Sequence, residues 1–229
     1  MAYSISSSLL IDTSTEQGFI AAIRNDNLLF HASLGGTFDS AQAVIPLLEK
    51  QLSENALQLS DMEAITVSIG PGSYTGIRIG VIIAKSLAYA LKKPLIGVPS
   101  VELFAPHSTE ISSFAVLLDA KMGGVYCAFG NHQDGKIIFE PAFTVAIDQL
   151  PTTLNGVQLI VSPHTAKLRE RSPFLRQLFW QDALPNPQLL WQNGKYRWQK
   201  GEFSTDATVN ILYLRRSQAE IERDAKENS

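Results

Sequence analysis

The segment GPGSYTGIRIG at residues 70–80 limits most strongly what this chain can fold into. It lies between a short apolar run at 64–69 and a stretch that keeps helical spacing to residue 91, so it joins a predicted strand to a predicted helix. Glycine and proline favour a tight turn, and backbone amides at the start of a helix can hold an anion. The segment is neither a P-loop, because no Gly-Lys-Ser/Thr follows, nor a dinucleotide-binding fingerprint. From the residues alone, anion binding and a simple tight turn both stay open.

Small residues recur every four positions from this turn into the helix. Gly, Gly, Gly, Ala and Ala stand at positions 72, 76, 80, 84 and 88. Residues four apart share one face of a helix, and glycine inside a helix costs about 1 kcal/mol relative to alanine. Two glycines within one helix therefore indicate that another backbone approaches this face closely. The spacing allows that backbone to belong to the same chain or to another subunit.

The rest of the first half alternates short apolar runs with turn signals. We expect strands at 9–12, 19–24, 28–34, 64–69 and 95–98, and helices at about 41–52, 75–91 and 101–105. Asn25-Asp26-Asn27 predicts a hairpin turn, Asp39 a helix cap and Pro46 a kink. Three strands followed by alternating helices and strands are typical of an α/β lobe with a mixed sheet.

A weaker version of this pattern begins at residue 114. We expect strands at 114–119, 123–129 and 136–140 and a charged helix at 217–226, whereas 141–210 gives no clear assignment. The sequence therefore predicts two lobes. The N-terminal lobe covers residues 1–110 and carries the two long helices, and a degenerate second lobe covers 111–229.

The composition is that of a globular protein, because 45% of the 229 residues are hydrophobic and 18% are charged. Cys127 is the single cysteine, so an internal disulfide is impossible, which fits a reducing compartment. No apolar run reaches the about 20 residues of a membrane span, since Arg78 and Lys85 interrupt the longest one. The first eight residues lack the pattern of a signal peptide. We expect a cytoplasmic protein without a membrane segment.

A net charge of −3 argues against a stand-alone nucleic-acid binder. One stretch, residues 163–216, is nevertheless rich in basic side chains. A solvated surface is the preferred interpretation, and contact with a phosphate backbone inside a complex is the alternative. The basic residues are Lys167, Arg169, Arg171, Arg176, Lys195, Arg197, Lys200, Arg215 and Arg216.

No complete catalytic constellation is visible in the sequence. Asp12-Thr13-Ser14-Thr15 follows the first strand, where a carboxylate and hydroxyls either hold a metal–nucleotide complex or form an ordinary turn. No pair of histidines has metal-ligand spacing, no serine lies in a nucleophile elbow, and Cys127 is expected to be buried. The candidate nucleotide or anion loop consists of Asp12, Thr13, Ser14, Gly70, Gly72 and Ser73, and the histidines are His31, His107, His132 and His164.

Four segments, in this order and at these separations, closely resemble the TsaB family, also called YeaZ. They are LIDTST at 10–15, the turn at 70–80, GVPSVE at 97–102 and LDAKMGGVY at 118–126. YLR at 213–215 resembles the tail motif of that family. The resemblance is strong over about residues 1–130 and loose over 140–205.

The resemblance implies a two-lobe actin/Hsp70-like fold of the ribonuclease-H type. It also implies a role in making N6-threonylcarbamoyladenosine (t6A) beside the tRNA anticodon. In that system TsaD transfers the threonylcarbamoyl group, TsaE is an ATPase, and TsaB is a non-catalytic subunit that dimerises with TsaD. Members of this family are therefore expected to meet tRNA through the complex, to have no cofactor of their own, and to meet ATP at the interface of the complex.

In the family, the helix after the hairpin and the helix after the glycine turn form the subunit interface. Carried onto this chain, that interface consists of Ala41, Val44, Ile45, Leu48, Gly76, Ile77, Gly80, Val81 and Ala84. An interface of this kind buries about 1,600 Å². Without the partner, the same apolar face is expected to form a homodimer.

The chain departs from the family pattern at a few positions. Phe38-Asp39-Ser40-Ala41-Gln42 stands where a His-Ser-Glu-like stretch is usual, Lys121 replaces an arginine, and Gly124 replaces a glutamate. These changes put the polar contacts at the rim of the interface in doubt. A small-molecule phosphotransferase of the same superfold, which would use Asp12 and the 70–73 turn, is the alternative function. A metallopeptidase is disfavoured because the paired histidines are missing.

Overall fold

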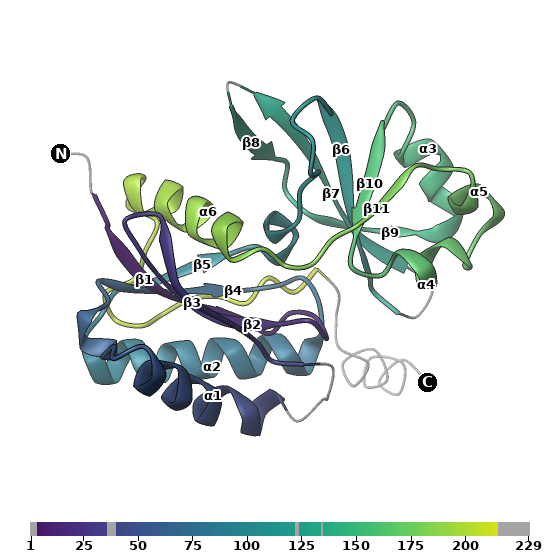
Figure 1. Ribbon diagram of the computed structural model, residues 1–229. Coiled ribbons are helices and arrows are strands. Elements are labelled where there is room, and N and C mark those ends of the chain that lie inside the picture. Colours follow the sequence, from purple (N-terminus) through teal and green to yellow (C-terminus); the bar gives the residue numbers. More distant parts are fainter. Residues whose placement is uncertain (1–3, 36–39, 122–123, 134, 215–229) are drawn as a thin grey trace, which may run out of the picture.

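The computed structural model describes residues 4–35, 40–121, 124–133 and 135–214. Two mixed β-sheets lie side by side, each with helices packed against it (Figure 1). The predicted helix at 217–226, the cap Asp39, and both Arg215 and Arg216 lie outside the described residues.

The first sheet has five strands in the order β3-β2-β1-β4-β5. Strand β2 is antiparallel to both β1 and β3, whereas β4 and β5 run parallel to β1. Asn25 and Asp26 both have a positive φ, as two-residue hairpin turns require, so the predicted hairpin is confirmed. The strands are β1 (Ser7–Asp12), β2 (Phe19–Arg24), β3 (Asn27–Ser33), β4 (Ala64–Ser68) and β5 (Leu95–Val98).

The second sheet repeats this arrangement in the order β8-β7-β6-β10-β11, with β9 paired to β7. Its first three strands are again antiparallel, and its last two again run parallel to the central strand. The α/β fold with two mixed sheets that the sequence predicts is confirmed. The strands are β6 (Ser113–Asp119), β7 (Gly124–Gln133), β8 (Lys136–Phe139), β9 (Phe143–Ala146), β10 (Leu159–Ser162) and β11 (Trp180–Asp182).

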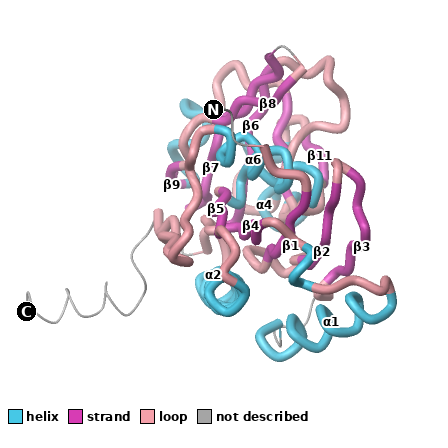
Figure 2. The backbone as a smooth tube through the Cα atoms, turned by 90° about the vertical axis from the view of Figure 1, so that its left-hand side faces the viewer, coloured by secondary structure: helices cyan, strands magenta, loops and turns pink. Residues whose placement is uncertain are grey.

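Long helices cover both faces of the first sheet (Figures 1 and 2). The helices α1 (Ser40–Glu54) and α2 (Tyr74–Leu91) lie against one face, and α6 (Pro187–Gln199) lies against the other. The side chain of Ser73 caps α2 by accepting a hydrogen bond from the amide of Gly76. The predicted helix over 75–91 is therefore confirmed, with its start one residue earlier.

Short helical turns fill the connections. Residues 101–105 do not form the predicted α-helix. Residues 101–103 belong to the 3₁₀ turn η2 (Ser100–Leu103), which ends where the backbone of Phe104 becomes extended. Three short helices pack on the second sheet in the region that the sequence leaves unassigned. The remaining elements are η1 (Leu59–Asp61), η3 (Ile147–Gln149), α3 (Leu150–Thr153), α4 (Thr165–Arg169) and α5 (Pro173–Arg176).

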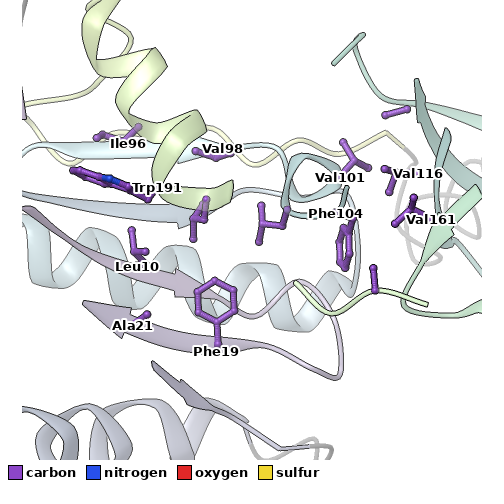
Figure 3. Packing of buried hydrophobic residues seen from close by; sticks show 14 of the residues in the cluster. Leu10, Phe19, Ala21, Ile96, Val98, Val101, Phe104, Val116, Val161 and Trp191 are labelled. Atoms are coloured by element: carbon purple, nitrogen blue, oxygen red, sulfur yellow. The ribbon is translucent and has the colours of Figure 1, made fainter. Parts of the chain in front are cut away.

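A single buried cluster connects the two lobes. It runs from Leu10 and Trp191 at the first sheet, through Phe104 after η2, to Val116 and Val161 on the second sheet (Figure 3). Separate clusters lie between the first sheet and α1/α2 and between the second sheet and its short helices. The lobes are therefore packed through a continuous apolar core.

The chain returns to the first lobe at its end, which differs from a second lobe covering all of 111–229. Helix α6 contacts β1, β2, β4 and β5. Residues 203–214, here called the C-terminal strap, then pair with the edge of the first sheet through two backbone hydrogen bonds between Leu95 and Ser204. Because strand β5 would otherwise be an open edge, the strap completes the first lobe.

By length and composition alone, α2 is apolar enough to cross a membrane, which the interrupted run at 77–84 did not predict. One third of that helix is buried inside this fold. Core helices of globular proteins pass the same test, so a single such helix is weak evidence for a membrane span.

Candidate functional site

The structure brings the residues of the predicted loop together at the carboxyl end of the first sheet. Asp12 ends β1 and Ser68 ends β4, and these strands are parallel neighbours. The Asp12 carboxylate oxygen Oδ1 accepts hydrogen bonds from the hydroxyl of Ser68, the hydroxyl of Ser14 at 2.7 Å and the amide of Ser14 at 3.1 Å. The aspartate is thus held by its own loop and by the adjacent strand.

Asp12 is completely buried, which is unusual for a carboxyl group. Within the described residues its second oxygen, Oδ2, has no hydrogen-bond partner. Burial raises the pKa of Asp12, and the hydrogen bonds from Ser68 and Ser14 only partly oppose this. The side chain acts as a buried hydrogen-bond acceptor inside the fold.

The glycine turn packs directly on the loop after β1. The amide of Ser73 donates to the carbonyl oxygen of Ser14 at 2.7 Å, and the amide of Gly70 donates to the Ser100 hydroxyl at 2.9 Å. A Cβ atom at Gly72 would lie 2.3 Å from the Ser14 carbonyl oxygen, so only glycine fits there.

These contacts decide whether the loop can hold the phosphates of a nucleotide, as the actin-like superfold implies. Two of the turn amides are already used within the chain, and the turn is closed onto Ser14 by backbone contact. A phosphate cradle needs free amides that point into open space. These two amides are therefore not available to a phosphate, and the phosphotransferase alternative is not favoured.

The small-residue face of α2 also faces the loop. The Thr13 hydroxyl donates to the carbonyl oxygen of Gly76 at 2.7 Å. A Cβ atom would lie 2.1 Å from the Thr13 carbonyl oxygen at position 76 and 2.2 Å from the Thr13 hydroxyl at position 80. The backbone that approaches these glycines closely is thus the end of β1 in the same chain.

Most of the predicted interface residues consequently face the first sheet. Ile45 is the exception, with 38% of its surface exposed, whereas the side chain of Ala41 lies outside what the structure describes. The buried residues do not form the predicted subunit interface, because a stripe of a helix that is packed against the sheet of its own chain is not available to a partner. The buried members are Val44, Leu48, Gly76, Ile77, Gly80, Val81 and Ala84.

The opposite side of α2 is the exposed one. We call it the α2 outer face and define it by Tyr74, Arg78, Ile82 and Tyr89. Ile82 is 61% exposed and Tyr89 80% exposed, high values for large hydrophobic side chains on a helix. The predicted interface did not include this face, because it was based on the stripe of small residues on the other side of α2. The spacing of residues 74, 78 and 82 is a signal for this second stripe.

The second lobe has a corresponding aspartate at the end of its central strand β6. Asp119 accepts a hydrogen bond from Arg171 at 2.7 Å and pairs closely with Lys167, and its backbone amide donates to Nδ1 of His164. Burial by itself acts to raise the pKa of Asp119, but the hydrogen bond and charge of Lys167 and the charge of Arg171 lower it below its usual value. Asp119 is therefore neutralised by its own lobe.

Four of the described basic residues in the stretch 163–216 form ion pairs, two in each lobe. Lys195 pairs with Asp26 and Arg197 with Glu102 in the first lobe, whereas Lys167 and Arg171 serve Asp119 in the second lobe. These cations stabilise the fold, which favours the structural interpretation of the stretch.

Other reactive side chains are isolated. Among the described residues, no three His, Cys, Asp or Glu side chains gather as metal ligands. Cys127 is buried in β7, and burial raises the pKa of its thiol to about 12, so it stays a thiol at neutral pH.

Known proteins resemble this chain in sequence and in fold. A family model described as TsaD, tRNA N6-adenosine threonylcarbamoyltransferase, matches residues 30–170. A tRNA threonylcarbamoyladenosine biosynthesis protein TsaB of Bacillus subtilis (strain 168) is 32% identical over 130 residues, 56% of this chain and 57% of that protein. A tRNA N6-adenosine threonylcarbamoyltransferase of Persephonella marina (strain DSM 14350 / EX-H1) is 28% identical over 118 residues, 48% of this chain and 34% of that protein.

The fold agrees over a longer part of the chain. A crystallised YeaZ from Pseudomonas aeruginosa superposes with a TM-score of 0.77 at 23% identity, covering 92% of this chain and all of that one. In sequence, by contrast, this chain spans about half the length of the TsaB relatives it matches.

Proposed function

Since the chain belongs to the TsaB (YeaZ) family of tRNA threonylcarbamoyladenosine biosynthesis proteins, we propose that it is a non-catalytic partner subunit in the synthesis of t6A. It docks on a TsaD-type transferase, activates it, and works with a TsaE-type ATPase. The observation that carries this proposal is that both strand-end aspartates are held by side chains of the same chain, Asp12 through one of its two oxygens, while large apolar side chains of α2 are left exposed.

The occupied aspartates support a non-catalytic role. Asp12 is buried against Ser14 and Ser68, and Asp119 is paired with Lys167 and Arg171. Both lie at the carboxyl ends of central strands, where ligands of open α/β sheets bind. With these groups used for packing, the chain contributes surface and leaves chemistry to its partner.

The α2 outer face, together with Ile45 of α1, supports docking on a relative of similar fold. Scattered apolar residues on a surface need no explanation, but Ile82 and Tyr89 are two strongly exposed large side chains on one helix. The transferase relative of Persephonella marina aligns with about half of this chain, so a TsaD-type partner can present a comparable helix pair. We propose a four-helix contact between the two subunits, and a homodimer through the same face when the partner is absent.

The other components follow from this assignment. We propose that tRNA is reached through the assembled complex, that ATP is used by the TsaE-type subunit or between subunits, and that the protein acts in the cytoplasm. The amides of Gly70 and Ser73, which donate to Ser100 and Ser14, support placing ATP outside this turn.

Reconstitution tests the proposal. The chain alone is expected to form no t6A on unmodified tRNA supplied with threonylcarbamoyl-adenylate. Adding the TsaD-type and TsaE-type proteins of the same organism is expected to produce t6A, and omitting this chain from that mixture is expected to abolish it. Unchanged t6A formation without the chain would refute the proposal.

A further inference from the structure

Two tyrosines and one arginine form a fixed cluster at the first turns of α2. Arg78 donates from Nε to the hydroxyl of Tyr213 at 2.8 Å and from Nη2 to the hydroxyl of Tyr74. The Arg78 guanidinium carbon also lies 3.9 Å above the centre of the Tyr74 ring, within cation–π distance. The rings of Tyr74 and Tyr213 lie 5.3 Å apart, so the three side chains hold one another.

The C-terminal strap brings Tyr213 to this place from a distant part of the sequence. Val209 lies where a Cβ atom at Gly97 would stand, and the amide of Leu212 donates to the carbonyl oxygen of Ile69 at 2.8 Å. Thr144 of β9 donates its hydroxyl hydrogen to the carbonyl oxygen of Leu214. The strap is thus fastened on both sides of Tyr213, to the first lobe and to the second.

The hydrogen bonds within the cluster leave several of its donors unused. Both tyrosine oxygens accept from Arg78, so their own O–H groups are available to another acceptor. Guanidinium has five N–H donors, and the cluster uses two of them. Within the described residues Arg78 forms no ion pair with a carboxylate, and Tyr74 and Tyr213 are 38% and 45% exposed.

We propose that Arg78, oriented by Tyr74 and Tyr213, is an anion-binding anchor that receives a side-chain carboxylate of the TsaD-type partner. This inference rests on the proposed function and adds a polar contact, with a stated chemistry, to an interface otherwise described by apolar residues. A fixed guanidinium fork matches a carboxylate in bidentate geometry, and the two phenol hydroxyls add donors on either side.

The surroundings favour a protein carboxylate over an RNA phosphate. Ile82 and Tyr89 continue the same face with apolar surface, which a phosphate backbone does not match. Helix α2 contains Arg78 and Lys85 but no acidic residue, so its outer face complements an acidic helix of a partner. Arginine and tyrosine are also the residues in which the energetic centres of protein interfaces are enriched.

Isothermal titration calorimetry of the full chain with the TsaD-type protein tests the anchor. Arg78→Gln is expected to weaken binding at least tenfold, and Arg78→Lys is expected to recover only part of that loss because it restores charge without the fork. Tyr213→Phe keeps the ring and removes the hydroxyl, so a loss of several-fold is expected. Lys136→Gln, which removes an exposed cation from β8 of the second lobe, is expected to bind like the wild type. Circular dichroism melting confirms that each variant is folded.

Each outcome decides a separate point. If the wild type binds and Arg78→Gln binds equally well, the anchor is overturned while the proposed subunit role stands. If the folded wild type fails to bind the TsaD-type protein, both are overturned. If Arg78→Gln leaves partner binding intact but abolishes a gel shift of unmodified tRNA by the isolated chain, the cluster is a phosphate site instead.

Discussion

At the scale of single residues, close backbone contact explains the glycine-rich segment better than ligand binding does. Thr13 and Ser14 occupy the space that side chains at 72, 76 and 80 would need. The pattern of small residues was visible in the sequence, but its partner was not. The spacing of small residues indicates that another backbone lies close to the helix, but not whether that backbone belongs to the same chain or to another subunit.

Gly80→Ala tests this contact. The added methyl group would lie 2.2 Å from the Thr13 hydroxyl, so we expect a loss of about 1–3 kcal/mol in the free energy of unfolding. Urea denaturation measures the loss, and the double variant Gly80→Ala with Thr13→Ala provides the control. Removing the hydroxyl should make the double variant more stable than the sum of the two single losses. Wild-type stability in Gly80→Ala would contradict the assignment.

The buried carboxyl of Asp12 predicts a pH dependence of stability. Because the pKa of Asp12 is raised by folding above its ordinary value of 3.8, the native state favours the protonated form. Its favourable contribution is complete below that ordinary value and is lost as pH rises through the raised folded pKa. Asp12→Asn cannot ionise, so its stability relative to the wild type should increase between acidic and neutral pH.

Urea denaturation of both proteins at several pH values measures this difference. If the stability of Asp12→Asn relative to the wild type stays constant with pH, or decreases as pH rises, the pKa of Asp12 is not raised by folding.

At the scale of elements, two ion pairs of α6 are expected to contribute differently to the stability of the fold. The Arg197–Glu102 pair is bidentate, and both side chains are largely buried. The Lys195–Asp26 pair lies at the surface, where Asp26 is 63% exposed. Burial raises the pKa of Glu102, and the hydrogen bonds and charge of Arg197 oppose that shift. Arg197 therefore stabilises the negative charge of the buried Glu102 carboxylate.

Arg197→Met should therefore cost about 3–5 kcal/mol, because it leaves Glu102 buried without its partner. Lys195→Met, the matched change two residues earlier, should cost at most about 1 kcal/mol. Thermal or urea unfolding compares them, and Glu102→Gln in the Arg197→Met background should restore part of the loss. Equal losses in the free energy of unfolding for Arg197→Met and Lys195→Met would contradict this ranking.

The two sides of α2 make a second comparison within one element. Ile82→Glu places a charge on the exposed outer face, so stability should change by about 0.5 kcal/mol or less while binding of the TsaD-type partner is lost. Val81→Glu, one residue away but buried, should unfold the chain. Light scattering after size exclusion, combined with unfolding curves, separates these effects. Partner binding by Ile82→Glu at wild-type strength would remove α2 from the interface.

At the scale of the whole molecule, elements with a clear period were predictable and those without one were not. The alternating and helical patterns up to residue 98 predicted the five strands of the first sheet, the hairpin turn at 25–27 and α2, but not the order of the strands in the sheet. Apart from α6, the strands and helices within residues 141–210 are three to five residues long, which is too short to show a period in the sequence. The return of α6 and the C-terminal strap to the first sheet depends on contacts between residues far apart in sequence, such as Leu95 with Ser204.

The candidate site followed the same division. Asp12, Ser14 and the 70–73 turn were expected to meet, and they do, because parallel strands place their ends at one edge. Whether a ligand fits between the loop after β1 and the 70–73 turn depends on the distances between their atoms, which cannot be derived from the sequence. The exposed Tyr74–Arg78–Tyr213 cluster joins positions 135 residues apart and could not be assembled from local spacing.

If the chain acts by docking on its partner and not by chemistry of its own, as we propose, the rate of t6A formation in the reconstituted system tests this directly. With TsaD-type and TsaE-type proteins, tRNA and threonylcarbamoyl-adenylate present, Asp12→Asn should support the wild-type rate, whereas Ile82→Glu should give the rate seen when the chain is omitted. A folded Asp12→Asn that binds the transferase but yields no t6A, together with a fully active Ile82→Glu, would contradict the account.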